Sequence, residues 1–192
     1  KEKMKKEFPA QLRDDMIEGI PVMRKRFPDY STYARSTMEE LFTTQQRKGS
    51  FRLEANHMRS SLIRNDGQGK FSIHALPLEA QFSMLNGMVL EDFNGDGNLD
   101  LLLNGNDFGT EVPFGRYDAL NGLVLLGLGD GNFKTLSITE SGIYIPGNGK
   151  GVSTLRNQAR ALMVAATENM GPLRIFEASM KLRIYVAEPE DA

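Results

Sequence analysis

The spacing of apolar residues changes once along the chain, near residue 50. Before that point the apolar positions recur at the period of an amphipathic helix, and they are Leu12, Met16, Ile17 and Ile20. Pro21 is expected to interrupt this helix. A second helix is predicted to begin near Ser31, a candidate N-cap, and to end at Lys48. Its predicted buried positions are Met38, Leu41 and Phe42.

After residue 50 the pattern switches to short apolar runs separated by glycine-rich turns, which favours a mainly β fold. Strands are predicted over 51–55, 61–64, 71–75, 86–92, 99–103, 123–126, 133–136, 152–155, 161–166 and 173–176. Segments 62–71 and 125–133 are alike, because each places a glycine-rich turn just before a phenylalanine that starts the next strand. Their separation of about 60 residues is compatible with successive propeller blades joined by an enlarged loop.

Composition narrows the class of protein. The 192 residues allow one domain with a small appendage, and the net charge of −2 does not support binding to nucleic acid. The absence of cysteine excludes thiol chemistry and disulfides. No run approaches the roughly 20 apolar residues of a membrane helix. The chain begins with Lys1 rather than methionine and has no signal peptide, so we expect it to be a piece of something longer.

The segment 92–100 carries the strongest chemical signal. Oxygen-bearing side chains alternate along it, with Gly97 after the third, and these side chains are Asp92, Asn94, Asp96 and Asp100. Alternating hard oxygen ligands round a glycine bend are typical of Ca²⁺ loops. An EF-hand is disfavoured because its twelfth position, which needs glutamate, falls on Leu103. The sequence therefore predicts a structural Ca²⁺ site between two strands.

The hairpin Asn65–Phe71 together with the loop 92–100 and the leucines after it resembles an FG-GAP (VCBS-type) repeat, over about residues 58–177. Such repeats form the blades of integrin-α-like β-propellers in bacterial surface and secreted proteins. Segment 105–122 further resembles the C-terminal repeats of large bacterial FG-GAP-like surface proteins, which often precede an ASPIC/UnbV-type domain. The resemblance implies that the backbone carbonyl of Asn98 joins the four side chains around Ca²⁺.

The resemblance implies a partial β-propeller of two to three blades over residues 51–192, preceded by a helical segment, 1–50. Residues 51–192 are too few for a closed ring of this repeat length. The open side is expected to be covered by the helices of 1–48 or by another chain, since bare strand edges invite aggregation. Two departures from the family matter: only one full loop is present, since 147–151 lacks the acidic pattern, and the helical segment is no part of the repeat.

The connection 104–121 is longer than an ordinary hairpin loop, and such loops are often functional. Its aromatic residues are Phe108, Phe114 and Tyr117, which form either a surface for a sugar or protein or an anchor that packs the loop on its own sheet. Glu111 and Asp118 are candidate glycosidase carboxylates, although solvated loop charges are commoner. The two histidines, His57 and His74, are a possible zinc pair or base, but ordinary hydrogen-bonded histidines are expected. No nucleophile elbow or phosphate-loop motif is present.

The sequence thus predicts a calcium-stabilised, non-enzymatic binding or scaffolding module at the cell exterior or outer-membrane surface. Its expected partner is a protein or glycan, including the remainder of a larger chain or complex. The alternative is a polysaccharide-active enzyme, or an accessory subunit of one, that uses carboxylates of loop 104–121. A third possibility is a purely structural spacer between domains.

Overall fold

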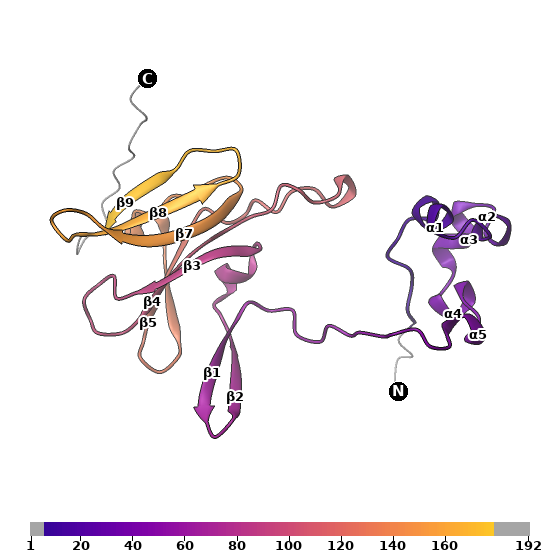
Figure 1. The fold of residues 1–192 in the computed structure, drawn as a ribbon, viewed down its shortest axis with the longest axis horizontal. Helices are drawn as coiled ribbons and strands as arrows, with labels where there is room; N and C mark the ends of the chain where they lie inside the picture. Colours follow the sequence, from indigo (N-terminus) through magenta and orange to yellow (C-terminus); the bar gives the residue numbers. More distant parts are fainter. Residues whose placement is uncertain (1–5, 179–192) are drawn as a thin grey trace. The chain divides into compact units, whose positions relative to one another are not determined.

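The computed structural model describes residues 6–178, which fall into two compact units, Lys1–Asn56 and His57–Ala192. The first is helical and the second consists of three antiparallel sheets, so the mainly β fold class is confirmed (Figure 1). The end of the predicted β segment, residues 179–192, lies outside the described residues. In the part that the structure describes, no helix is long and apolar enough to cross a bilayer.

The helical unit contains five short helices. They are α1 (Arg13–Gly19), α2 (Met23–Arg26), α3 (Tyr30–Arg35), α4 (Met38–Leu41) and α5 (Thr44–Arg47). The predicted single helix from Ser31 is wrong in two respects. Its N-cap is Asp29, whose side chain accepts the N–H of Thr32, and the helix is divided because Thr37 and Thr43 each begin a new one with a capping box. The buried core of the unit is Ile17, Met23, Phe27, Tyr33 and Leu41.

The predicted strand over 51–55 is also wrong. These residues have no strand partner, although their apolar and polar side chains alternate. Phe51 is 88% exposed and Leu53 is 82% exposed. Alternation alone therefore did not produce a strand here, because a strand also needs a hydrogen-bonding neighbour.

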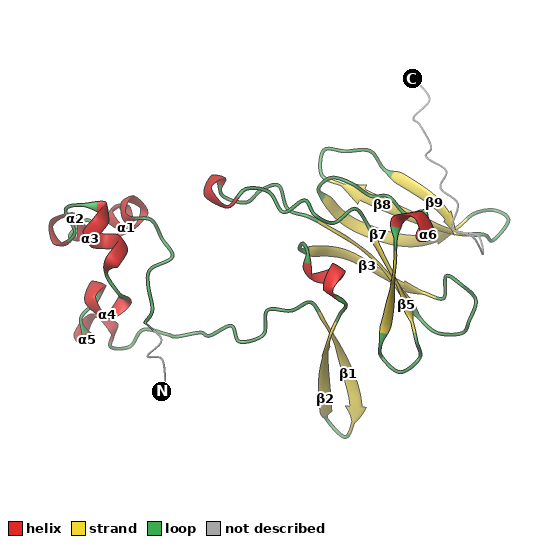
Figure 2. Ribbon diagram, turned by 180° about the vertical axis from the view of Figure 1, so that it is seen from behind, coloured by secondary structure: helices red, strands yellow, loops and turns green. Residues whose placement is uncertain are grey.

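The β unit begins with the hairpin β1 (Ser61–Gly67) and β2 (Lys70–Ala75), followed by the 3₁₀ helix η1 (Leu78–Gln81). A four-stranded sheet follows in sequential order, made of β3 (Leu85–Glu91), β4 (Asp100–Gly105), β5 (Leu123–Gly127) and β6 (Phe133–Leu136). The short helix α6 (Ile138–Ser141) leads to a three-stranded sheet of β7 (Gly149–Arg156), β8 (Leu162–Glu168) and β9 (Arg174–Ala178). Figure 2 shows these sheets from behind.

Apolar side chains of the four-stranded and three-stranded sheets share one core. Leu102 and Val124 from the first sheet pack with Val164 and Phe176 from the second. A second cluster on the other face of the four-stranded sheet includes Leu125 and is completed by Ala80 of η1. The central strands β4 and β5 are therefore covered on both faces, which explains their nearly continuous leucine content.

The two hairpins that look alike in sequence have the same register. Ile63 pairs with Ile73 in the first hairpin, and Leu125 pairs with Thr135 at the equivalent position of the second. Their surroundings differ, since Leu125 is fully buried whereas Ile63 is 65% exposed. We call the exposed apolar side of the first hairpin the bare hairpin face; it consists of Ile63, Phe71 and Ile73. The assignment of these sheets to propeller blades stays a prediction.

Candidate functional site: the loop between β3 and β4

The loop between β3 and β4 is held in shape by the half-buried carboxylate of Asp92. Its Oδ1 accepts the backbone N–H groups of Gly95 at 2.7 Å and Asp96 at 3.1 Å. Its Oδ2 accepts the N–H of Gly97 at 2.9 Å. Gly97 has φ of +88°, the left-handed conformation that glycine adopts readily. One acidic side chain thus gathers three successive N–H groups and bends the chain around itself.

Asn94 and Asp96 contact each other in the same loop, and both are exposed. Asn94 donates from Nδ2 to Asp96 Oδ2 at 2.9 Å, and its Oδ1 accepts the N–H of Asp96 at 2.9 Å. Asp96 Oδ1 accepts the N–H of Asn98 at 2.8 Å. The N–H of Asn98, followed by the amide of Asn94, holds the pKa of Asp96 below its ordinary value of 3.8. Asp96 is therefore an ionised carboxylate at neutral pH.

Asp100 lies at the start of β4 and is fully buried. Its Oδ2 accepts the N–H of Phe93 at 2.9 Å, which closes the loop on itself. Its Oδ1 accepts the N–H of Gly127, at the end of β5, at 2.8 Å. The buried carboxylate is thus compensated by two backbone donors, and it ties the loop to the neighbouring strand.

The predicted metal ligands therefore divide into two kinds. Asp92, Asn94 and Asp96 lie in the loop itself, and each has acceptor capacity beyond the hydrogen bonds that it makes. Asp100 keeps one lone pair on each oxygen but faces the protein interior, and Asn98 is half-buried with its side-chain oxygen beside Gly129. All are hard oxygen donors of the type that Ca²⁺ takes.

Carboxylates alone do not make a metal cluster in this structure. Among residues 6–178, no three acidic, histidine or cysteine side chains gather closely enough to hold a metal ion. Calcium sites also draw on amide and backbone carbonyl oxygens, which such a group does not include. The donor set of the loop thus fits a calcium ion only if amide and backbone oxygens complete it.

The connection 104–121 forms a projecting arm that contains one isolated β-bridge and one short 3₁₀ helix (Figure 1). At its base Asp107 and Tyr117 exchange two backbone hydrogen bonds, at 2.8 and 2.9 Å. Its tip is the 3₁₀ helix η2 (Val112–Phe114), where Phe114 is 67% exposed. Phe108 is half-buried, and the guanidinium of Arg116 lies 4.9 Å from its ring centroid. The three predicted aromatic residues are therefore distributed along the arm, with Phe108 already covered by a cation.

Tyr117 borders a hollow of about 300 Å³ at the base of the arm. Its lining residues include no charged group, and they are Met58, Ser60, Gln81, Phe82, Ser83, Met84 and Tyr117. Gln81 is engaged internally, since its amide bonds both backbone groups of Ser60. Methionine and aromatic side chains therefore share the exposed lining with polar atoms, and the hollow is of mixed character.

The residues considered for alternative chemistry lie in ordinary surroundings. His57 bonds the hydroxyl of Ser61 at 2.8 Å, and His74 bonds that of Ser72 at 3.0 Å. Glu111 and Asp118 are both exposed on the arm. Neither carboxylate lines the hollow beside Tyr117.

Sequence reasoning missed a buried seam of asparagine and glycine between β3, β4 and β7. Asn104 is fully buried and donates to Gly151 O at 2.9 Å, while its Oδ1 has no hydrogen-bond partner among residues 6–178. A Cβ on Gly87 would stand 2.5 Å from that oxygen and 2.7 Å from the backbone nitrogen of Val152. Glycine is needed here because the two strands approach closely. The Asn-Gly repeats at 104–106 and 147–151 are the available sequence signal for this seam.

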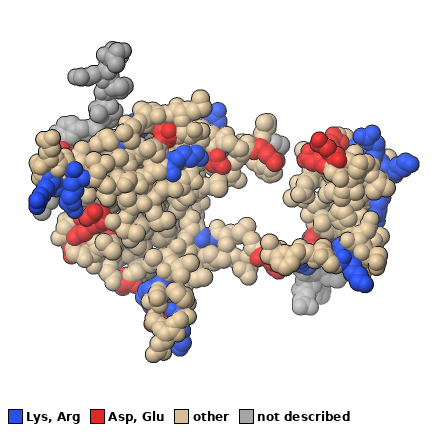
Figure 3. Space-filling model, in the orientation of Figure 1, with Lys and Arg blue, Asp and Glu red and all other residues tan. Residues whose placement is uncertain are grey.

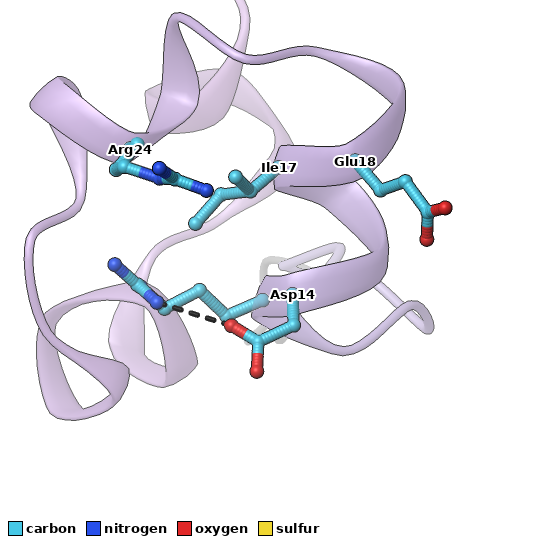
Figure 4. Close-up of a pocket in the computed structure, with 5 residues that line it drawn as sticks. Asp14, Ile17, Glu18 and Arg24 are labelled. Carbon is cyan, nitrogen blue, oxygen red and sulfur yellow. Dashed lines mark hydrogen bonds and ion pairs between the residues drawn. The ribbon is translucent and has the colours of Figure 1, made fainter.

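The helical unit offers a separate small hollow of about 250 Å³ (Figure 4). Its Arg13 is committed to structure, because it donates to Phe27 O at 2.9 Å and Pro28 O at 3.0 Å and pairs with Asp14 at 3.1 Å. In Figure 4, Arg24 reaches toward Ile17, whereas Glu18 points away. On the face drawn in Figure 3, acidic and basic groups form small separate clusters rather than one basic surface.

No protein-family model, no curated protein and no solved structure matches this chain. The functional conclusion therefore depends on the geometry described above.

Proposed function

We propose that this chain is a calcium-stabilised binding or scaffolding module, without enzymatic activity, that contacts a protein or glycan. The observation that carries the proposal is the loop 92–100. An acidic side chain has already bent it into a turn, and the exposed, ionised Asp96 lies on that turn. A divalent cation there would be held by carboxylate oxygens of Asp92 and Asp96 together with amide and backbone oxygens of the loop.

A structural role for the ion is favoured over a catalytic one by the position of Asp100. That carboxylate joins the loop to Gly127 of β5, so order in the loop is transmitted to the sheet. A catalytic metal instead keeps an open coordination position in a cleft. Free calcium is plentiful outside cells, which fits a module at the cell exterior or outer-membrane surface.

The arm 104–121 and the hollow beside Tyr117 are the proposed contact surface. The hollow combines two methionines and two aromatic residues with no carboxylate in its lining. Hydrolysis of a glycosidic bond requires two carboxyl groups flanking the bond, about 5–10 Å apart. The absence of a carboxylate from this lining therefore favours binding of a side chain or sugar face over hydrolysis at this hollow.

Calcium binding is tested by calorimetric titration of CaCl₂ into the chelator-treated full chain. Asp96→Ala should weaken the measured affinity at least about tenfold, since it removes a charged ligand. Asp130→Ala is the matched control, because Asp130 also accepts a backbone N–H in a glycine-rich turn but lies outside the loop. No heat of binding in the unmodified chain, or equal weakening by both substitutions, would remove the proposal.

The contact surface is tested with arrays of immobilised peptides and glycans. Tyr117→Ala should abolish or reduce any specific signal, whereas Tyr144→Ala should leave it unchanged. The two tyrosines are matched in exposure, at 45% and 47%. An equal loss from both would mean that the hollow is not the site.

A further inference from the structure

Asparagine followed by glycine is the dipeptide most prone to lose ammonia, because glycine leaves its own backbone nitrogen unshielded. The chain contains five such pairs, at Asn86, Asn94, Asn104, Asn121 and Asn148. The structure places them in very different surroundings. Those surroundings determine which of the five can react.

Asn94 is exposed, as is Asn86, and the neighbours of Asn94 match the needs of the reaction. The reacting nitrogen, Gly95 N, donates to Asp92 Oδ1 at 2.7 Å, so a carboxylate already holds the proton that must leave. The side-chain oxygen that must take up charge, Asn94 Oδ1, accepts the N–H of Asp96 at 2.9 Å. That same hydrogen bond closes an Asx turn that spans the Gly95 peptide.

The other four pairs lack this combination. Asn104 and Asn148 are buried away from water. Asn86 lies within strand β3, and its Nδ2 is held by two hydrogen bonds of 2.8 Å to the backbone oxygens of Asn106 and Gly149, whereas Nδ2 of Asn94 makes one, to Asp96 Oδ2. Asn121 is half-buried, and the glycine that follows it packs against Ile143 and Ile145.

We propose that Asn94 and Gly95 form a self-modifying site, with Asp92 as the proton acceptor. Gly95 N attacks Asn94 Cγ, its proton passes to Asp92, and a Cγ–N bond forms. The Cγ–Nδ2 bond then breaks and ammonia leaves with the transferred proton, which closes a succinimide ring. Water opens either ring carbonyl and yields aspartate or isoaspartate at position 94. The net change is gain of one water and loss of one ammonia.

The modification converts a neutral oxygen ligand into an anionic one, or lengthens the backbone within the turn. The link to calcium rests on the proposed function. An ion coordinated by the side-chain oxygens of Asp92 and Asn94 would block both the proton acceptor and the reacting amide. Calcium should then protect the loop, and its loss should start the modification. The fraction of chains converted at position 94 would then increase with the time that the protein spends without calcium.

The experiment is peptide mapping by mass spectrometry of the full chain during incubation at neutral pH without calcium. Position 94 should exchange its amide for a carboxyl at least about tenfold faster than Asn121, which is the internal comparator. Asp92→Asn should remove most of this difference in rate, since a placed general base contributes about 10²–10⁴-fold. In urea the ratio of the two rates should fall toward one, because the folded contacts are lost. Equal rates at the two positions in the folded chain would overturn the proposal.

Two further results separate this inference from the metal proposal. If Asp92→Asn disturbs the fold, the buried Asn104 will also react faster. In that case the test is the unmodified chain, in which the ratio of the rates at positions 94 and 121 must be higher in the folded state than in urea. Protection of position 94 by added calcium would support both proposals. A fast rate that calcium does not change would uphold the self-modification and count against calcium at this loop.

Discussion

The side chain of Asp100 and the backbone N–H of Gly127 lie 2.8 Å apart, although 27 positions separate them in the chain. Through this contact a carboxylate at the start of β4 fixes the end of β5. The same carboxylate also accepts the N–H of Phe93. The loop 92–100 is therefore joined directly to the end of the interior strand β5.

Asp100→Asn should destabilise the protein by about 2–4 kcal/mol. The amide retains one acceptor oxygen, so either Phe93 N–H or Gly127 N–H is left buried without a partner, and the charge that strengthened both bonds is lost. Unfolding in urea, followed by circular dichroism, measures the change. Asp130→Asn is the control, since Asp130 is exposed and should alter stability by less than about 0.5 kcal/mol. Similar losses for the two substitutions would contradict the structural role of Asp100.

Asp96→Ala should lower the melting temperature of the calcium-loaded protein and have little effect once EDTA is present. The reason is that Asp96 is exposed and contributes mainly through the proposed ion, which stabilises only the folded state. Differential scanning calorimetry with and without chelator gives the comparison. A loss of the same size in both conditions would show that Asp96 acts through its hydrogen bonds instead.

The order of the loop should depend on acidic pH in a defined direction. The pKa of Asp96 is lowered in the folded chain, first by the N–H of Asn98. Its contribution is therefore complete above the ordinary value of 3.8 and is lost as pH falls through the lower folded value. The amide resonance of Asn98, followed by NMR, should titrate with that folded pKa. In Asp96→Asn this titration should vanish, and its persistence would assign the transition to another group.

Gly87→Ala should destabilise the β unit by about 1–3 kcal/mol or more. The added Cβ would stand 2.7 Å from the backbone nitrogen of Val152, which cannot move without separating β3 from β7. Gly151→Ala is the matched control in the same seam, because its Cβ would meet only the hydroxyl of Thr167, at 3.2 Å. Urea unfolding of both variants checks the difference. A smaller cost for Gly87→Ala than for Gly151→Ala would contradict the close approach.

Much of the β unit was predictable because its signals are local. Alternation and glycine-rich turns located all nine strands that the structure describes, and the hairpin that joins the first two was predicted from its glycine-rich turn. The 51–55 error shows the limit of such signals. A strand exists only with a neighbour, and the identity of neighbours is not local information.

The candidate site was predictable in composition but not in arrangement. The alternating oxygens identified the loop. Nothing near Asp100 in the sequence, however, indicates that its carboxylate accepts the N–H of Gly127. Likewise, Asn104 was placed at the start of the long connection 104–121, whereas it is buried at the end of β4 and donates to Gly151 O. Both contacts join residues that only the sheet order brings together.

The bare hairpin face has a consequence for how the protein behaves in concentrated solution. Ile63 and Ile73 lie side by side on this two-stranded ribbon and form an exposed apolar surface with Phe71. Burial of that surface against another flat apolar surface lowers the free energy, because apolar groups are removed from water. Reversible self-association that strengthens on warming from the cold is the thermodynamic signature of such a surface. A single lysine in place of Ile63 should keep the chains apart.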